Sequence, residues 1–165
     1  MTKPDANPPL LTERNARFIC SEVSINIAGR NARNFPSLAR AYGCRVSADR
    51  RQITVFLPIA RSESVLRDIR EIGAIAAVFT RPSTNESIQI KGGDAKIVAL
   101  QSGDRLVMQE YGRIFVCDIN SIGYRNPFAS AMMRAVAEES VAVVFTPDAA
   151  FEQTPGPGAG KRLTP

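Results

Sequence analysis

The sequence predicts a mainly β protein of the α+β class, an antiparallel barrel of about six strands with a few helices inserted. Segments in which apolar residues recur at every second position fill most of the first 60 residues, and short turns separate them. One stretch with helical spacing follows the third of these segments, and two more precede the last strand. Such short connections favour hairpins, and therefore a closed antiparallel barrel over a parallel sheet with crossover helices.

The limits of the expected elements follow from turn and capping residues. A helix is expected to begin at Ser62 or Ser64, either of which can cap its N-terminus, and to end at Gly73. Asn126 followed by Pro127 predicts the start of the last helix. The expected strands span residues 18–28, 38–48, 52–60, 74–80, 87–100 and 141–146, and a further helix is expected over residues 104–122.

One domain is the expected organisation, because 165 residues can bury one sizeable core. We expect the barrel to span residues 18–146. A flexible arm is expected over residues 1–17, which begin with a polar, Pro-rich run. An irregular tail is expected over residues 147–165, which contain the run Pro-Gly-Pro-Gly-Ala-Gly.

The hairpin expected over residues 74–100 carries the best candidate site. Its second strand alternates, with isoleucines on one face and Ser87, Gln89 and Lys91 on the other. Paired glycines beginning at Gly92 then predict a bulge or a sharp bend. A hydroxyl, an amide and an ammonium group on one face have no obvious structural purpose, so we predict that this face binds a ligand. A solvated strand face is the alternative of equal weight.

Histidine is absent from the sequence, and this excludes several classes of site. Ser-His-Asp hydrolysis, His-ligated haem and the usual His-based metal sites all require it. Three widely spaced cysteines, Cys20, Cys44 and Cys117, favour reduced thiols in a cytoplasm over a disulfide framework or a zinc site. We expect these cysteines to be buried as small apolar residues, an interpretation favoured over a redox thiol, and we expect no metal.

The net charge of +5 is concentrated near the N-terminus, because residues 1–51 hold nine basic and four acidic residues. A solvated basic surface is the favoured interpretation. The more specific alternative is a basic entrance to a binding site that attracts a phosphorylated ligand. Nucleic-acid binding ranks third, because no recognised motif and no interleaved aromatic residues accompany the charge. The arginines concerned are Arg14, Arg17, Arg30, Arg33, Arg40, Arg45, Arg50 and Arg51.

Nothing in the sequence indicates a membrane protein. No apolar run approaches the roughly 20 residues that a membrane helix needs. The Pro-rich N-terminal run is not typical of a signal peptide. A cytoplasmic protein without membrane or nucleic-acid partners is therefore expected.

Several of these segments together resemble a known family. Three alternating strands, a short helix, and the runs Ile-Ala-Ala-Val-Phe-Thr and Ile-Gln-Ile-Lys-Gly-Gly-Asp-Ala resemble the FMN-binding split barrel of the pyridoxamine 5′-phosphate oxidase-like superfamily. The resemblance spans about residues 18–160, and the run that begins Phe-Thr-Pro-Asp-Ala-Ala is similar to a bacterial subgroup. It implies a homodimeric flavoprotein that holds FMN between its subunits, and an FMN-dependent oxidoreductase of unknown substrate.

The resemblance also implies which residues contact the cofactor. In the family a Ser-x-Lys pair at the start of the first helix binds the phosphate, and this chain has Val65 where the lysine is expected. Nearby arginine and serine side chains can substitute, because a guanidinium and a helix N-terminus both bind phosphate. An ordinary cap and a surface charge are the alternative there. The implied cofactor-binding residues are Arg61, Ser62, Ser64, Thr80, Arg81, Ser87, Gln89 and Lys91.

Two departures from the family pattern shape the alternatives. True pyridoxamine phosphate oxidases carry an Arg-x-His substrate motif near the C-terminus, and a chain without histidine is not expected to catalyse that reaction. The missing lysine favours a flavin-free dimeric split barrel that acts as a binding or interaction module. A relative that uses a deazaflavin or haem ranks third, because haem would need cysteine or tyrosine ligation here.

Overall fold

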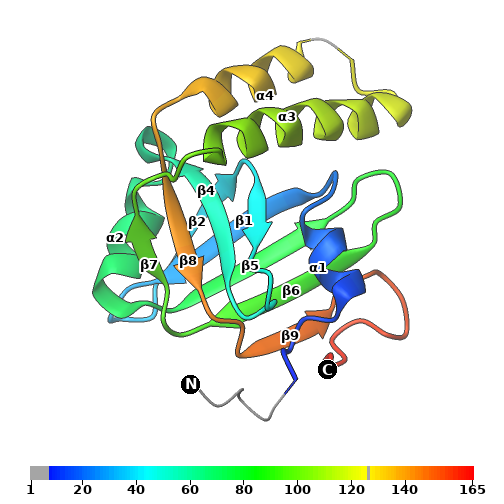
Figure 1. Ribbon diagram of the computed structural model, residues 1–165. Coiled ribbons are helices and arrows are strands. Elements are labelled where there is room, and N and C mark those ends of the chain that lie inside the picture. The colour runs from blue at the N-terminus through cyan, green and yellow to red at the C-terminus, as the bar shows by residue number, and fades with distance from the viewer. Residues whose placement is uncertain (1–7, 126) are drawn as a thin grey trace.

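A computed structural model of the protein describes residues 8–125 and 127–165, which form an antiparallel barrel split into two sheets and covered by helices (Figure 1). The strands are β1 Ser24–Arg30, β2 Pro36–Ala41, β3 Cys44–Val46, β4 Ile53–Pro58, β5 Ile75–Thr80, β6 Ser87–Gly92, β7 Lys96–Val98, β8 Ser140–Phe145 and β9 Ala149–Glu152. The helices are α1 Glu13–Ile19, α2 Glu63–Ile72, α3 Asp104–Ser121 and α4 Phe128–Ala137, with a 3-10 turn η1 at Ile59–Arg61.

The strand order confirms the predicted fold class. Sheet A contains β2-β1-β5-β6-β9 and sheet B contains β3-β4-β8-β7, and all the pairings between named strands are antiparallel. The described residues hold more strands than the six expected. Two expected strands are each divided at glycines, and the C-terminal tail contributes a further strand.

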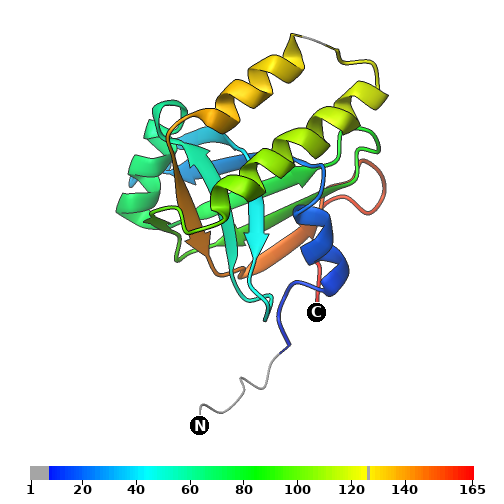
Figure 2. The same cartoon turned by 45° about the horizontal axis from the view of Figure 1, so that its top comes forward.

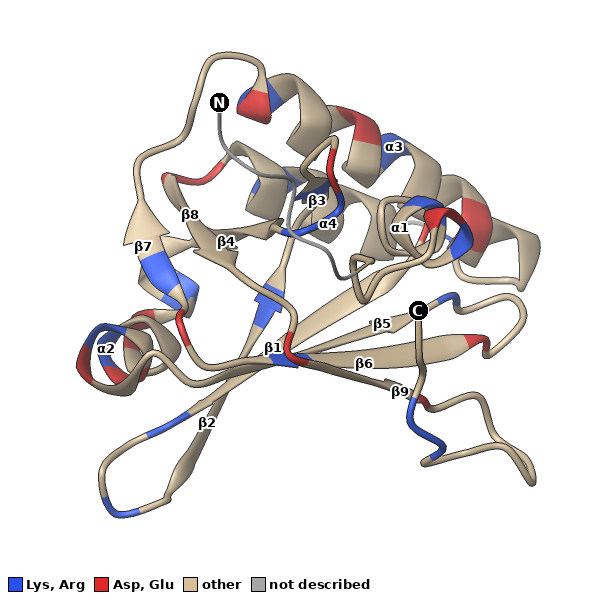
Figure 3. Cartoon of the chain, turned by 60° about the horizontal axis from the view of Figure 1, so that its bottom comes forward, with Lys and Arg blue, Asp and Glu red and all other residues tan. Residues whose placement is uncertain are grey.

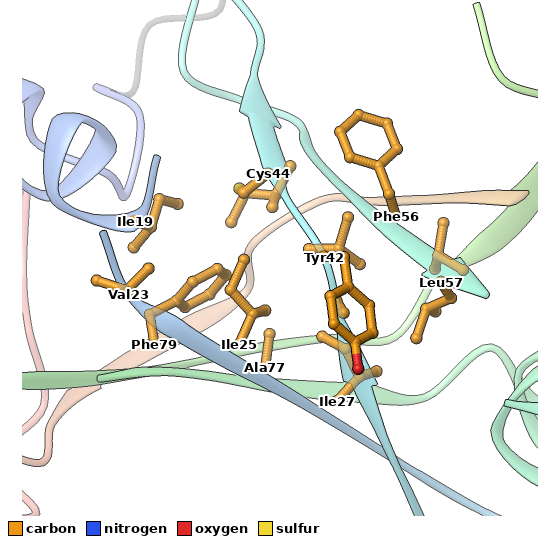
Figure 4. Packing of buried hydrophobic residues seen from close by; sticks show 14 of the residues in the cluster. Ile19, Val23, Ile25, Ile27, Tyr42, Cys44, Phe56, Leu57, Ala77 and Phe79 are labelled. Carbon is orange, nitrogen blue, oxygen red and sulfur yellow. The ribbon is translucent and has the colours of Figure 1, made fainter. Parts of the chain in front are cut away.

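The core lies between the two sheets. Ile25 and Ile27 of β1, with Ala77 and Phe79 of β5, point from sheet A toward sheet B (Figure 4). All four are fully buried. Removing a large apolar side chain from water contributes roughly 1.5–3 kcal/mol. The strict alternation of β1 and β5 therefore fixes which face of sheet A is turned inward.

Glycines divide two of the expected strands. Gly43 separates β2 from β3 with a φ of +123°, a conformation that residues with a side chain rarely adopt. Gly92 ends β6 in sheet A, and the chain then enters β7 in sheet B. The bend predicted at the paired glycines is therefore confirmed.

The N-terminal segment differs from the expected flexible arm over residues 1–17. Residues 1–7 lie outside the described part of the chain, but Glu13 begins helix α1. The side chain of Thr12 caps this helix by accepting a hydrogen bond from the backbone N–H of Asn15 at 3.2 Å. Leu11 is fully buried, so this segment belongs to the core. Because α1 continues to Ile19, the first strand begins later than expected.

The expected irregular tail over residues 147–165 also differs from the structure. Strand β9 pairs with β6, with Ala150 opposite Ile90 and Phe151 opposite Gln89. Ala150 is buried, and its carbonyl accepts a hydrogen bond from the backbone N–H of Leu163 at 2.8 Å. The tail therefore covers an edge of sheet A, which would otherwise expose unpaired backbone groups.

Helices α3 and α4 lie side by side above sheet B (Figures 1 and 2). Helix α3 is continuous through Gly112. The glycine is needed there because it faces α4 at close range. A Cβ there would lie 3.1 Å from Met133 Sδ and 3.2 Å from Val136 Cγ2. The expected cap Asn126 lies outside the described residues. None of the described helices is both long enough and apolar enough to cross a membrane.

We predict that Gly92→Ala destabilises the protein by about 1–3 kcal/mol, the usual effect of overpacking. A Cβ at Gly92 would lie 2.7 Å from both Phe145 Cδ2 and the carbonyl oxygen of Thr146. Gly93→Ala is the matched control, because its Cβ would meet nothing closer than 3.8 Å. Urea unfolding of both variants is the measurement. Equal stability of the two would contradict the proposed close approach.

Candidate functional site

The polar face predicted on β6 is present, but its three residues differ in exposure and in the contacts they make. Lys91 is exposed, with its ammonium group 5.2 Å from the centre of the Phe151 ring. Gln89 is half-buried. Ser87 is buried, and its hydroxyl lies 2.7 Å from the hydroxyl of Thr80. Two of the five polar residues expected at this hairpin therefore satisfy each other.

Arg81 is held by several groups of the protein itself. Its guanidinium lies 3.2 Å from carboxylate oxygens of both Glu22 and Glu86, and it donates to the Ser21 hydroxyl at 3.0 Å. It also stacks on the Phe18 ring, 5.1 Å from the ring centre. These contacts tie the hairpin to the end of α1. The guanidinium is thus already neutralised by two carboxylates.

The residues expected to bind phosphate lie at the N-terminus of α2. Arg61 donates to both carboxylate oxygens of Glu138, which raises the pKa of Arg61 and lowers the pKa of Glu138. Ser62 is only 2% exposed, and its hydroxyl has no hydrogen-bond partner among the described residues. Ser64 is exposed. This helix terminus therefore holds one unsatisfied buried hydroxyl beside an arginine that already has a partner.

Val65 is fully buried in the core. A lysine at this position would place an ammonium group away from water, which is costly without a partner. The alignment that sets the family lysine at Val65 therefore leads to a core position and not to a phosphate contact.

The eight predicted residues do not form one site. The turn between β5 and β6 and helix α2 lie at opposite ends of sheet A (Figure 1). Thr80, Arg81 and Ser87 lie near this turn. Lys91 lies toward the other end, where it lines a cavity of about 430 Å³ with Arg30.

Arg40, one of the arginines of the basic N-terminal segment, is the strongest candidate for binding an anion. Arg40 of β2 has its guanidinium 4.8 Å from the ring centre of Phe115 and 5.8 Å from that of Tyr42. Its Nε and Nη2 atoms are buried and have no hydrogen-bond partner among the described residues. No carboxylate within ion-pair distance of Arg40 is found in this part of the chain. The guanidinium is thus partly buried without a counter-charge.

Three other arginines of the same basic segment have a counter-charge. Arg14, Arg17 and Arg45 each pair with a carboxylate. Basic residues lie on several elements, including α1, α2 and the turn between β1 and β2 (Figure 3). The positive excess therefore does not gather into one patch. Among the described residues of this segment, Arg40 is set apart because nitrogens of its guanidinium are buried without a hydrogen-bond partner.

Tyr111 adds a second unsatisfied group beside Arg40. Its hydroxyl is buried and makes no hydrogen bond of good geometry in the described structure, although the Arg40 guanidinium approaches it. Its ring stacks on Phe115 with centres 5.8 Å apart. Burial raises the pKa of Tyr111 to about 12, although the positive charge of nearby Arg40 acts to lower it. The phenol therefore keeps its proton at neutral pH and can donate a hydrogen bond.

Strand register relates Arg40 to the polar face of β6. Arg40 pairs with Asn26, Asn26 pairs with Val78, and Val78 pairs with Gln89. Residues opposite one another on paired strands share a face, so Arg40 and Gln89 lie in one row on the outer face of sheet A. Three strand spacings separate them, about 14 Å in all.

Helix α3 is fixed over Arg40 at both of its ends. At its start, buried Asp104 accepts from Arg45 of β3 at 3.1 Å and from the backbone N–H of Gln101 at 2.7 Å. Near its end, Asp118 accepts from the backbone N–H of Ser83 at 3.1 Å. The aromatic rings around Arg40 are therefore held by contacts to both sheets.

Three solved structures resemble this geometry along most of their length. HupZ of Group A Streptococcus aligns with a TM-score of 0.54 at 13% identity, covering 92% of this chain and 98% of HupZ. An F420 reductase aligns with a TM-score of 0.52 at 13% identity, covering 85% of this chain and 98% of the reductase. A pyridoxamine 5′-phosphate oxidase candidate from Lactobacillus delbrueckii aligns with a TM-score of 0.51 at 12% identity, covering 88% and 97%.

The chain has the fold of the pyridoxamine 5′-phosphate oxidase-like split barrels. The resemblance inferred from sequence is thereby confirmed for the split-barrel architecture. No protein-family model and no curated protein matches the chain. At such low identity the comparison shows the fold alone, and the ligand is inferred from the residues of this chain.

Arg81→Ala should destabilise the protein by about 1–3 kcal/mol, because it removes the ion-pair partner of Glu22 and leaves Glu86 with Arg14 alone. Arg113→Ala is the control, because Arg113 pairs with Glu110 on the exposed surface of α3 and should not change the unfolding midpoint measurably. Thermal unfolding compares the two variants. If Arg81→Ala is as stable as the wild type, the ion pairs of Arg81 do not stabilise the fold, and Arg81 becomes a candidate ligand-binding residue again.

Proposed function

We propose that this split barrel binds FMN and that Arg40 holds its phosphate. The observation that supports this is the partly buried guanidinium without a counter-charge. Burying an unpaired charge costs several kcal/mol, and an anionic group beside it offsets that cost. A phosphate also accepts hydrogen bonds in the planar fork that a guanidinium presents.

The other groups near Arg40 fit the same anion. The hydroxyl of Tyr111 can donate to a phosphate oxygen, since it keeps its proton. Tyr42 contacts Arg40 on one side and lies close enough to Arg61 to influence the pKa of that residue. The buried hydroxyl of Ser62 follows Arg61 directly. Arg61 and Arg81, the arginines first expected to bind phosphate, already have carboxylate partners.

The flavin ring and ribityl chain would then lie along the outer face of sheet A. Gln89 shares a row with Arg40, and Lys91 lies one row further along β6. The neighbouring strands place two small side chains, Ala28 and Ala76, in the same row as Lys91. Such a floor offers room for a flat ring, and Gln89 and Lys91 supply donors beside it.

A bound flavin supplies one-electron and hydride-transfer chemistry, so we infer an oxidoreductase as the reaction class. The protein would bind and orient the cofactor, and Lys91 would offset negative charge on the ring. Among the compared proteins, the F420 reductase and the pyridoxamine phosphate oxidase candidate agree with this class. The absence of histidine still argues against the vitamin B6 reaction itself.

A flavin-free binding module is the second candidate function. It is favoured by one observation: both arginines first expected to bind phosphate are already neutralised, Arg61 by Glu138 and Arg81 by two carboxylates. Titration of the protein with flavins, described next, tests both candidate functions.

FMN and riboflavin differ at the phosphate, so they separate its contribution from that of the ring. We expect the purified chain to bind FMN at least tenfold more tightly than riboflavin. Arg40→Ala should weaken FMN binding by about 10–100-fold, the equivalent of a lost charge-assisted hydrogen bond of roughly 1.5–3 kcal/mol. The same variant should leave riboflavin affinity unchanged. Flavin fluorescence during titration gives both constants.

Tyr111→Phe provides a second variant that keeps the ring stacking and removes only the hydroxyl. It should weaken FMN but not riboflavin, by a smaller factor than Arg40→Ala. Arg61→Ala is the matched control for loss of a positive charge. If that control reduces FMN affinity as much as Arg40→Ala does, the phosphate lies at α2. No flavin binding by any of the proteins would favour the flavin-free module.

We further propose a homodimer. The hairpin of β1 and β2 exposes Phe35 and Leu38, which are 61% and 71% accessible, along an edge strand of sheet A. Exposed apolar residues on a free strand edge are typical of a surface that pairs with another chain. Light scattering at micromolar concentration should report a dimer, and Leu38→Asp should shift it toward monomer. A wild-type protein that is monomeric at this concentration would contradict the proposal.

A further inference from the structure

Two cysteines from separate elements lie together beneath α3. Cys20 follows the last residue of α1, and Cys44 is the first residue of β3. Both line a cavity of about 340 Å³, which is closed on its other side by Tyr111 and neighbouring residues of α3. Cys44 is buried, whereas Cys20 and Cys117 are exposed. The expectation that all three cysteines are buried is therefore wrong for two of them.

Hydrogen bonds give the two thiols different properties. Hydrogen bonding with Cys44 and with the backbone of Val46 lowers the pKa of Cys20, against the opposing effect of its partial burial. Burial raises the pKa of Cys44 well above its usual range, and the adjacent Cys20 raises it further. One thiol is thus exposed and has a lowered pKa, and its neighbour is buried and has a raised pKa.

We propose that Cys20 and Cys44 are a peroxide-sensitive thiol pair that forms a disulfide within one chain. The proposal rests on their shared cavity and on the difference in exposure between the two cysteines. It does not depend on flavin binding.

The reaction needs one hydroperoxide as oxidant. The Cys20 thiolate attacks a peroxide oxygen, the O–O bond breaks, and hydroxide leaves and takes a proton to become water. Cys20 then carries a sulfenic acid. The sulfur of Cys44 displaces the hydroxyl group from Cys20, an S–S bond forms, and the Cys44 proton leaves with the hydroxyl as a second water. Two thiols lose two electrons, and hydrogen peroxide is reduced to two waters.

The position of the pair gives the reaction a structural consequence. A disulfide would join the end of α1 to β3, two elements that are separated in sequence by all of β1 and β2. Tyr111 borders the cavity of the two cysteines and also lies beside Arg40. Oxidation would therefore alter the wall of the proposed phosphate site.

Treating the reduced full-length protein with one equivalent of hydrogen peroxide tests the proposal. Two thiols per chain should be lost, and the mass should fall by two hydrogen atoms. Proteolysis without reductant should release a cross-linked peptide that contains Cys20 and Cys44, and dithiothreitol should reverse the change. The thiol of Cys117 should react at least about tenfold more slowly, because its pocket is lined by Glu22 and Asp118 and, among the described residues, by no second cysteine.

Single substitutions separate the roles of the cysteines. Cys20→Ser should abolish the disulfide and protect Cys44 from oxidation. Cys117→Ser should react as the wild type does. Cys44→Ala should leave a sulfenic acid on Cys20 that dimedone traps. A cross-link that involves Cys117, or oxidation of Cys20 to sulfinic acid while Cys44 stays reduced in the wild type, would overturn the proposal.

Discussion

The close approach of Gly92 to the end of β8 lets a single chain build both sheets. At this point the chain leaves β6 in sheet A and turns toward β7 in sheet B, and only a hydrogen atom fits against Phe145 and Thr146. The passage from β8 to β9 crosses in the opposite direction beside it. Asp94 accepts a hydrogen bond from the backbone N–H of Thr146 at 2.8 Å, and Lys91 accepts one from Asp148 at 2.9 Å. The two crossings therefore hold each other in place.

This double crossing also determines the surroundings of the candidate site. Because the second crossing delivers β9 to the edge of β6, Phe151 comes to lie opposite Gln89 and beside Lys91. The first crossing places Ala95 where its backbone N–H donates to the carbonyl of Gly73 at 2.9 Å, which anchors the end of α2. The outer face of sheet A, which carries Gln89 and Lys91, thus depends on contacts made by the glycine turn.

Local signals in the sequence predicted the elements that local chemistry determines. Helix α2 ends at Gly73 in the left-handed conformation, as its capping position indicates, and the hairpin of β5 and β6 follows from alternation. Strand β9 escaped prediction because its four residues carry no periodicity of their own, and its identity as a strand comes from pairing with β6, about sixty residues earlier. The capping signal of Thr12 was readable, but the Pro-rich run before it favoured an arm.

In the candidate site, too, local sequence predicted some features, whereas others depend on residues distant in the chain. The basic excess in residues 1–51 was visible, but which arginine lacks a counter-charge depends on carboxylates far away in sequence. Arg45 finds Asp104, and Arg14 finds Glu86, whereas Arg40 meets the rings of α3. No spacing rule relates these positions, because the chain folds between them. The alternation that singled out Gln89 and Lys91 could locate a face, but not the distant residue that shares its row.

Helix α3 links the chemistry proposed for Arg40 and for the cysteine pair. It removes water from the guanidinium of Arg40, and charges attract a counter-ion more strongly where the effective dielectric constant is lower. The same helix encloses Cys44 and holds it in the neutral form, since burial disfavours a thiolate. Both effects require α3 to stay fixed over β3, and the buried carboxylate of Asp104 provides that attachment through Arg45. The ion pair at the start of α3 therefore controls how much water reaches either group. Its arginine directly follows Cys44, and the positive charge acts to lower the pKa of that thiol against the effect of burial.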